Sequence, residues 1–238
     1  MSNNRNTAMM VGVLYIVGTV TGILSVVCTQ PIFTAPDILS QISAQPNQLV
    51  AGALFVLTMG LSLAMVPVLL YPILKKSHPV LALGYVVFRG ALETTIYLML
   101  VSCWLFLLVF GQEYAAGAAN APFLQMLSTV LLKGHDAISN LLIIVFSLDA
   151  LMLYTMLYQT RLVPRWIPVW GFIAILMHFS TAFLALFGIV EGGVTPVTGL
   201  IDFPIFLQEM VMAVWLIAKG FEPSAMTALS AKPAVSQA

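Results

Sequence analysis

Residues 84–100 read Gly-Tyr-Val-Val-Phe-Arg-Gly-Ala-Leu-Glu-Thr-Thr-Ile-Tyr-Leu-Met-Leu, an apolar run that contains one arginine and one glutamate. A run of this length and composition is typical of a membrane-spanning helix. The charged residues, Arg89 and Glu93, are four positions apart, so they share one face of that helix and can pair. Full charges inside a membrane span are costly, which indicates a partner or a function.

The composition of the whole chain is that of a membrane protein. Of 238 residues, 61% are hydrophobic and 8% are charged, and the mean hydropathy is +1.02, well outside the range of soluble domains. Nine Lys and Arg residues balance nine Asp and Glu residues, so the net charge is zero. No basic stripe or nucleic-acid motif is present. We therefore expect the lipid bilayer as a partner and no nucleic acid.

Six apolar runs are long enough to cross a bilayer. They predict an all-α fold, a polytopic membrane helical bundle with six transmembrane helices. We expect residues 1–221 to form a single transmembrane domain and residues 222–238, rich in Ala, Ser and Pro, to form a disordered cytoplasmic tail. The six runs cover residues 9–29, 49–74, 80–110, 137–158, 169–190 and 201–218.

The positive charges predict the orientation of the bundle, because Lys and Arg accumulate in cytoplasmic loops. Seven of the nine lie in segments on the same side as the N-terminus. We therefore expect a multi-pass protein of the cell (plasma) membrane with both termini in the cytoplasm. The seven are Arg5, Lys75, Lys76, Arg161, Arg165, Lys219 and Lys232.

The region around the fourth span is too long for one crossing. Residues 122–158 as a single helix would measure about 55 Å, against a hydrocarbon layer of about 30 Å. We expect a break at Gly134, with Asp136 as the N-cap of a helix that begins at Ala137. Residues 122–133 would then form one short amphipathic outer helix.

Five ionisable residues in four of the predicted spans fall near the middle of the bilayer. Arg89, Asp149, His178 and Glu209 each lie nine residues from the cytoplasmic end of their span, a depth of about 13 Å, and Glu93 lies one turn further out. Because isolated charges in lipid are costly, we expect these side chains to face one another in one polar layer. Asp202, at the outer end of the last span, is interpreted as a helix N-cap instead.

The polar layer is rich in acid. One arginine faces three carboxyl groups, and burial disfavours charge, so shared protons or a bound cation are both consistent with it. This predicts a midplane binding site for a proton, a cation or a small cationic solute, and the protein would bind or transport it. The alternative is that the network only joins helices and fixes their register.

Cysteine and histidine patterns do not indicate a metal site or a cofactor. There is no Cys-x-x-C motif and no cluster with metal-ligand spacing. Cys28 and Cys103 fall toward the same side of the membrane, so they either form a disulfide or serve as small apolar packing residues. We therefore expect neither metal nor cofactor.

Four stretches of the chain resemble the bacterial membrane family known as domain of unknown function 4386. The match is collinear and covers residues 5–221. It implies an integral membrane protein with several helices and no assigned activity, and it transfers no catalytic residue. The stretches are Arg-x-x-Ala-x-x-x-Gly-x-x-Tyr from Arg5, Tyr-Val-Val-Phe-Arg-Gly-Ala-Leu-Glu from Tyr85, Val-Pro-Arg-Trp-Ile-Pro-Val-Trp-Gly from Val163, and Phe-Leu-Gln-Glu from Phe206, leading to Trp-Leu-Ile-Ala-Lys-Gly-Phe at residues 215–221.

Two other functions remain open at the level of sequence. Gly18 and Gly22 form a small-xxx-small pattern that allows close helix contact, so the protein could be an accessory subunit or a membrane sensor, including a homo-oligomer. An intramembrane enzyme would use His178 with a carboxylate as a general base. The usual motifs of metalloproteases, serine hydrolases and phosphate-binding loops are absent from the sequence.

Overall fold

The fold is all-α, as expected, in a computed structural model that describes residues 2–117, 120–189 and 196–231. No strand occurs within these ranges. The elements are α1 (Ser2–Phe33), α2 (Ile38–Ala44), α3 (Pro46–Leu74), α4 (Pro79–Tyr85), η1 (Val86–Glu93), α5 (Thr94–Ala115), α6 (Ala121–Thr160), α7 (Trp166–Leu186), α8 (Pro196–Ala218) and α9 (Pro223–Ala231).

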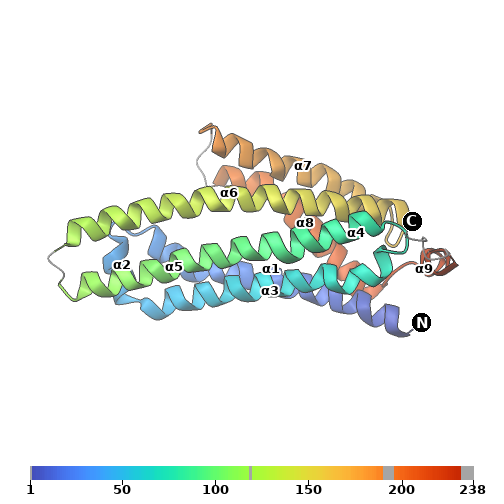
Figure 1. Cartoon of the computed structure of the whole chain (residues 1–238), viewed down its shortest axis with the longest axis horizontal. Helices are drawn as coiled ribbons and strands as arrows, with labels where there is room; N and C mark the ends of the chain where they lie inside the picture. Colours follow the sequence, from blue (N-terminus) through green and yellow to red (C-terminus); the bar gives the residue numbers. More distant parts are fainter. Residues whose placement is uncertain (1, 118–119, 190–195, 232–238) are drawn as a thin grey trace.

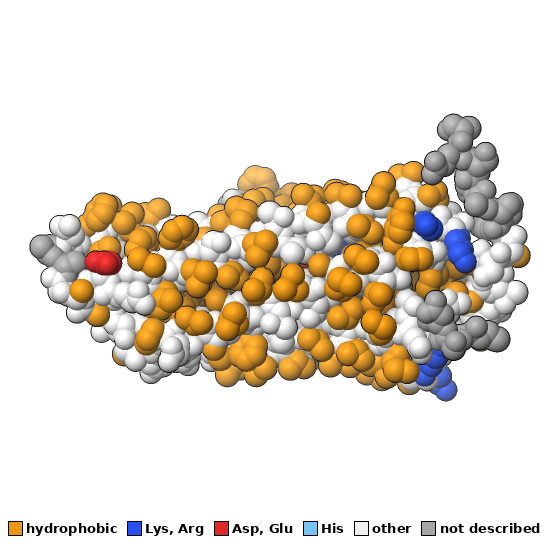
Figure 2. All heavy atoms as spheres, turned by 60° about the horizontal axis from the view of Figure 1, so that its bottom comes forward, with side chains coloured by type: hydrophobic (Ala, Val, Ile, Leu, Met, Phe, Trp, Pro, Cys, Tyr) orange, Lys and Arg blue, Asp and Glu red, His pale blue; other side chains and the backbone are white. Residues whose placement is uncertain are grey.

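Six helical segments of the described chain are long and apolar enough to cross a membrane, which confirms the predicted polytopic bundle. The third of them, Pro79–Ala115, consists of α4, η1 and α5 in one unbroken rod. Hydrophobic side chains cover much of the length of the face shown in Figure 2. Such a surface is stable in lipid and not in water, so this is a multi-pass membrane protein.

The helices run side by side in an elongated bundle (Figure 1). α1 packs against α3 on one side and α8 on the other, while α7 packs against both α6 and α8. α6 extends past the ends of α7 and α8, so the end of the bundle far from the N-terminus is made mainly by α2, α5 and α6. Two apolar clusters fill the interior, one nearer each end, and Met59 packs against both.

The predicted break in the fourth span was wrong. Gly134 and Asp136 lie inside α6, a continuous helix of 40 residues, about 60 Å long. Asp136 is exposed beside His135 and caps nothing, and residues 122–133 are the first part of α6. The cost of one glycine in a helix is only about 1 kcal/mol. Side chains on both sides of Gly134, including Leu132 and Ile138, pack against the apolar cluster at the end of the bundle far from the N-terminus, and this packing keeps the helix intact.

A short helix does lie at the end of the bundle far from the N-terminus, but it comes from elsewhere in the chain. α2 begins after Asp37, whose side chain accepts a hydrogen bond from the Ser40 amide at 3.2 Å. The Tyr114 hydroxyl donates to the other oxygen of Asp37 at 3.0 Å, which joins α2 to the end of α5. Leu39 and Ile42 are the buried residues of α2, and Ile42 faces Gly111 at the end of α5.

The first residues of α1 and the helix α9 lie at the same end of the bundle, as an even number of spans requires (Figure 1). Lys and Arg side chains gather at one end of the face in Figure 2, and acidic side chains are visible near the other. The gathering of Lys and Arg at one end agrees with the loop charges from which the orientation was predicted. That this end is cytoplasmic stays a prediction.

The beginning of the expected disordered tail is folded. Residues 223–231 form α9, and Ala225 and Leu229 are buried against the same apolar cluster as the ends of α1 and α8. The composition favoured disorder, but tertiary packing provides the burial that a short helix needs. Residues 232–238, with Lys232, lie outside the described residues. The division of the chain into one domain and a tail stays a prediction.

Candidate functional site

Arg89 and Glu93 lie on a π-helical segment in the middle of the third span. η1 covers Val86–Glu93, and its backbone makes wider turns than an α-helix. Such segments are rare and frequently mark functional sites. Both side chains point into the bundle, with exposed fractions of 2% for Arg89 and 1% for Glu93. The side chains of Arg89 and Glu93 therefore occupy different positions from those they would have on a regular α-helix.

The guanidinium of Arg89 is the hub of the predicted polar layer. Its Nη1 lies 3.2 Å from Glu93 Oε2 and 3.6 Å from Asp149 Oδ1 on α6. Its Nη2 lies 3.6 Å from Glu209 Oε1 on α8. Three carboxyl groups from three spans thus surround one cation, and their formal charges sum to −2. Four of the five predicted site residues converge as the sequence indicated.

Two aromatic rings also contact the guanidinium. Arg89 Cζ lies 4.9 Å from the centroid of the Phe146 ring and 5.8 Å from that of Tyr15. Ring faces attract a cation in a dry site and add to the stabilisation by the carboxylates. The Tyr15 and Tyr85 hydroxyl oxygens lie 3.3 Å apart, which joins α1 to α4 beneath the charges.

His178, the fifth predicted residue, makes no ion pair with this hub. Its Nδ1 lies 2.7 Å from Asp202 Oδ1, and its ring meets Phe146 edge-on at a centroid distance of 5.3 Å. Phe146 therefore lies between His178 and Arg89. The interpretation of Asp202 as an N-cap was wrong, because α8 begins earlier, at Pro196, and Asp202 is inside the helix.

A cavity of about 550 Å³ lies beside these charges. Its ionisable lining consists of Arg89, Glu93, Glu209, His178 and Asp202, while Asp149, on the other side of Arg89, is outside the lining. The remaining lining residues come from α1, α3, α5, α6 and α8: Gly18, Thr19, Gly22, Ile23, Val26, Val27, Met59, Leu63, Tyr97, Leu142, Ile143, Phe146, Ile205 and Phe206.

Several polar atoms at the hub have unused hydrogen-bonding capacity. Arg89 and the Tyr97 side chain both lie against the Glu93 carboxylate. Neither oxygen of Glu93 has a well-aligned hydrogen bond from the described residues, however, and the same holds for Arg89 Nε and Asp149 Oδ2. Buried polar groups in native proteins are nearly always paired, and an unpaired one costs about 1–3 kcal/mol. Glu93 lines the cavity, so a positively charged group placed in the cavity can lie against its carboxylate.

Hydrogen-bonded tyrosines close the bundle between the cavity and the end that carries the N-terminus. The Tyr154 hydroxyl donates to Gln208 Oε1 at 2.8 Å, and Gln208 Nε2 donates to the Ile167 carbonyl at 3.1 Å. Gln208 is fully buried. The cavity thus occupies the half of the bundle away from the termini.

Sequence reasoning missed four side chains of this site: Tyr15, Phe146, Asp202 and Gln208. Only Gln208 carried a usable signal, since an amide next to Glu209 inside a span requires a buried partner. Aromatic residues are too common in membrane spans for Tyr15 or Phe146 to stand out.

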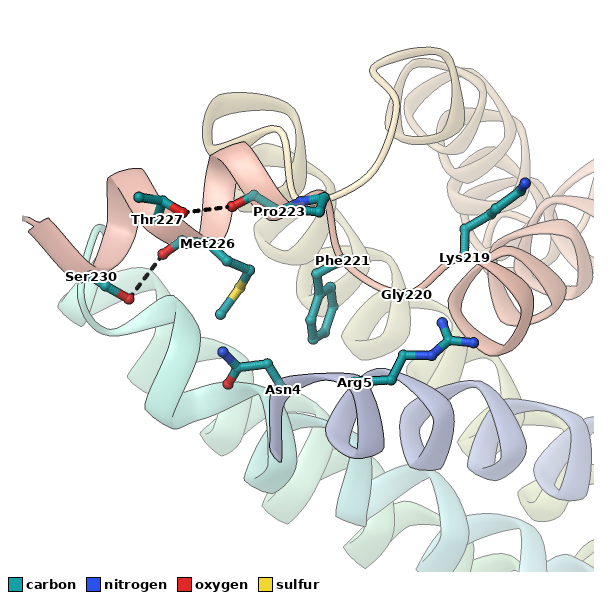
Figure 3. A pocket seen from close by; sticks show the side chains of 9 residues that line it. All are labelled: Asn4, Arg5, Lys219, Gly220, Phe221, Pro223, Met226, Thr227 and Ser230. Carbon is teal, nitrogen blue, oxygen red and sulfur yellow. Dashed lines mark hydrogen bonds between the residues drawn. The ribbon is translucent and has the colours of Figure 1, made fainter. Parts of the chain in front are cut away.

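A second cavity, of about 470 Å³, lies where the start of α1 meets α9 (Figure 3). Arg5 Nη2 donates to the carbonyls of Ile217 and Ala218 at 2.8 and 3.2 Å, so the guanidinium caps the end of α8. In Figure 3 the Phe221 ring and Met226 face each other across the hollow, and the Lys219 amine is turned away from it. This arrangement joins the start of α1 to the end of α8 and to α9, and we place no binding site there.

The remaining candidate features concern metals and cysteines. Among the described residues, no group of three or more His, Cys, Asp or Glu side chains could hold a metal ion. Cys28 and Cys103 are both free thiols, and Cys103 is buried as a packing residue.

Comparison with known proteins identifies the family. The family described as Domain of unknown function (DUF4386) matches residues 10–220, nearly the whole chain, so the chain belongs to it. No curated protein matches, and no solved structure matches.

Proposed function

We propose that this member of the DUF4386 family binds a small solute with a positively charged group in the cavity beside Arg89, with Glu93 and Glu209 as its counter-charges. The observation that carries the proposal is the position of Glu93. Its carboxylate is almost fully buried, makes no well-aligned hydrogen bond with the described residues beside its ion pair with Arg89, and lines the cavity.

The charge balance of the hub supports a cationic ligand. Arg89 offsets one of the three carboxylates around it and leaves two. Uncompensated charge inside a membrane span is costly, so the site gains free energy when protons or a cationic group occupy it. A bound cation and bound protons are then alternatives for the same carboxylates, and binding of one displaces the other.

The shape and lining of the cavity favour an organic cation over a bare ion. Its volume falls within the range of about 300–1,000 Å³ that is usual for ligand pockets. Three aromatic rings, those of Tyr97, Phe146 and Phe206, line it together with the carboxylates. Aromatic faces next to carboxylates are the usual surroundings of an ammonium group.

Binding is the first step of the transport that the sequence also suggested. A hydrogen-bonded layer separates the cavity from the end of the bundle that carries the N-terminus; it consists of Tyr15, Tyr85, Tyr154 and Gln208. A solute that crosses the membrane from the cavity to that end requires this layer to open. We infer that movement of α8 against α6 would do this, since the Tyr154–Gln208 hydrogen bond joins those two helices.

The two other candidate functions have less support from the geometry. A methyl group at Gly18 would lie 2.8 Å from Leu63 Cδ2, and one at Gly22 would lie 2.8 Å from Met59 Sδ. The two glycines therefore serve the packing of α1 against α3 within one chain. An imidazole–carboxylate pair of the kind an enzyme would use does line the cavity, in His178 and Asp202. The neighbouring hydroxyls of Ser180 and Thr181 donate to backbone carbonyls, so neither is presented to the imidazole as a nucleophile.

The proposal is tested by binding of benzyltrimethylammonium, a permanent cation, to the purified protein in lipid nanodiscs. Its uncharged carbon analogue, neopentylbenzene, is the ligand control. We expect the cation to bind at least about tenfold more tightly than the analogue, and Glu209→Gln to remove most of that difference. Glu113→Gln, an exposed carboxylate at the other end of α5, should leave it unchanged. Equal affinities for both ligands would refute the proposal.

A further inference from the structure

We infer that the solute is an amphiphile whose charged head reaches Glu93 and Glu209 while its apolar tail lies in a groove between α1 and α8 that opens toward the lipid. This inference rests on the proposed function and adds the chemical class of the ligand and its route of entry.

The lining of the cavity has a charged floor, apolar walls on α1 and α8, and one further polar pair, His178 with Asp202. The floor is the Arg89 hub. The wall on α1 consists of Ile23, Val26 and Val27, with exposed fractions of 50%, 46% and 61%. Phe206 forms the wall on α8 and is also exposed. Residues that line a cavity and are also exposed mark its opening, which therefore lies between these two helices.

The packing of α1 explains why the two helices part there. At Gly12 they touch, because a methyl group at this position would lie 2.5 Å from the Ala213 carbonyl oxygen. Further along the same face of α1, at 7 and 11 residues from Gly12, Thr19 and Ile23 line the cavity, and Phe206 lines it from α8. The cavity therefore separates α1 from α8 beyond Gly12 and forms a wedge between them.

The wedge faces hydrocarbon. Its α1 wall lies within the span Asn4–Phe33, and its α8 wall lies within the span Thr198–Ala218. For a small hydrophilic cation, transfer from water into hydrocarbon before it reaches the site is strongly unfavourable in free energy. An amphiphile already resides in the bilayer, and its tail passes from lipid to an apolar wall at little cost. The opening therefore selects a ligand that arrives from within the membrane.

The groove is long enough for an alkyl chain. From Gly18 to Val27 the α1 wall measures about 13 Å along the helix. The walls carry no ionisable side chain from α1, whereas the floor carries Glu93 and Glu209. A single-chain amine or quaternary ammonium compound matches both parts: the head takes the place of protons at the carboxylates, and the chain covers Ile23, Val26 and Phe206.

A photoreactive amphiphile tests this inference in proteoliposomes. The probe is a dodecyl chain with a trimethylammonium head and a diazirine near the end of the tail, and the control is the same chain with a hydroxyl head. We expect the charged probe to label residues 23–27 of α1 and residues 203–206 of α8, and the hydroxyl probe to label them at least about tenfold less, because it lacks the charge that the floor attracts.

A matched pair of variants separates the groove from the charged site. Ile23→Trp fills the wall, whereas Val20→Trp adds the same bulk at an equally exposed position of α1 outside the cavity lining. We expect Ile23→Trp to lose labelling by the long probe while binding of benzyltrimethylammonium stays within about threefold of the wild type. Val20→Trp should retain both. Val26→Trp repeats the test at a second wall position.

The outcomes distinguish this inference from the function on which it rests. If Ile23→Trp and Val26→Trp label like the wild type, or lose both ligands equally, the tail does not occupy the groove, and the charged site stands alone. If neither benzyltrimethylammonium nor the charged probe binds the wild type in preference to its uncharged control, the proposed function itself is wrong. Labelling spread evenly along the lipid-facing side of α1, including Val20, would also refute entry through the groove.

Discussion

Arg89 Nη1 lies 3.6 Å from Asp149 Oδ1, and this contact joins the third span to the fourth at the centre of the bundle. Both side chains are buried, and the cavity is lined by Arg89 but not by Asp149. The two carboxylates on the other side of the guanidinium, Glu93 and Glu209, do line it. The hub thus has a structural side and a side available to a ligand.

Removal of the guanidinium should destabilise the protein strongly. Arg89→Gln leaves three carboxyl groups without their cation, and the loss of one partner from a buried ion pair costs about 3–5 kcal/mol. Unfolding by sodium dodecyl sulfate in mixed micelles measures this loss. Lys76→Gln, at an exposed position, is the control and should change stability by less than about 0.5 kcal/mol.

A second substitution should restore part of that stability. Arg89→Gln combined with Glu93→Gln removes one of the uncompensated carboxyls, so the double variant should unfold at a higher detergent fraction than Arg89→Gln alone. If Arg89→Gln unfolds like the wild type, the ion pairs do not hold the bundle together.

The two sides of the hub should respond differently to loss of charge. Asp149→Asn should lower the free energy of unfolding by about 1–3 kcal/mol, because it weakens a buried contact with Arg89, yet keep the affinity for benzyltrimethylammonium within about threefold. Glu209→Gln should have the opposite pattern, since Glu209 lines the cavity and is 17% exposed. Parallel unfolding and binding measurements decide this. Equal loss of affinity in both variants would mean that the hub acts as one charge.

Two glycines provide a test of the packed layer. A methyl group at Gly171 would lie 2.7 Å from Tyr154 Cζ, so Gly171→Ala must displace the ring that donates to Gln208. We expect a loss of stability of about 1–3 kcal/mol. Gly134→Ala meets no atom within 4 Å and should stabilise α6 by about 0.5–1 kcal/mol. Thermal unfolding in detergent measures both, and a stable Gly171→Ala would show that Tyr154 can move freely.

The orientation in the membrane can be tested with single cysteines. In a background of Cys28→Ala and Cys103→Ala, Glu113→Cys should react with an impermeant maleimide on intact cells. Lys76→Cys should react only after the cells are opened, because its loop is predicted to be cytoplasmic. The reverse pattern would place the N-terminus outside.

The convergence of Arg89, Glu93, Asp149 and Glu209 could be predicted because lipid penalises unpaired charge and each residue falls at a similar depth in its span. The partner of His178 could not be predicted from the sequence. It depends on where α8 begins, and the start at Pro196 places Asp202 inside the helix and opposite the imidazole. The π-helical segment around Arg89 has no local signal, because its hydrogen-bond register depends on tertiary packing.

The errors in the fold arose from local signals that packing overrides. Gly134 and Asp136 resemble the start of a helix, but α6 continues through them because its side chains pack on both sides. Residues 223–231 have the composition of a tail, yet α9 buries Ala225 and Leu229. Both cases depend on contacts with residues far away in the chain.

The central claim is that a cation occupies the cavity between Glu93 and Glu209. Anomalous diffraction from crystals grown with bromobenzyltrimethylammonium tests it most directly. We expect a bromine peak inside the cavity, near Phe146 and Phe206, with the ammonium group beside the two carboxylates. A bromine peak elsewhere in the protein at saturating ligand, with the cavity free of the ligand, would contradict it.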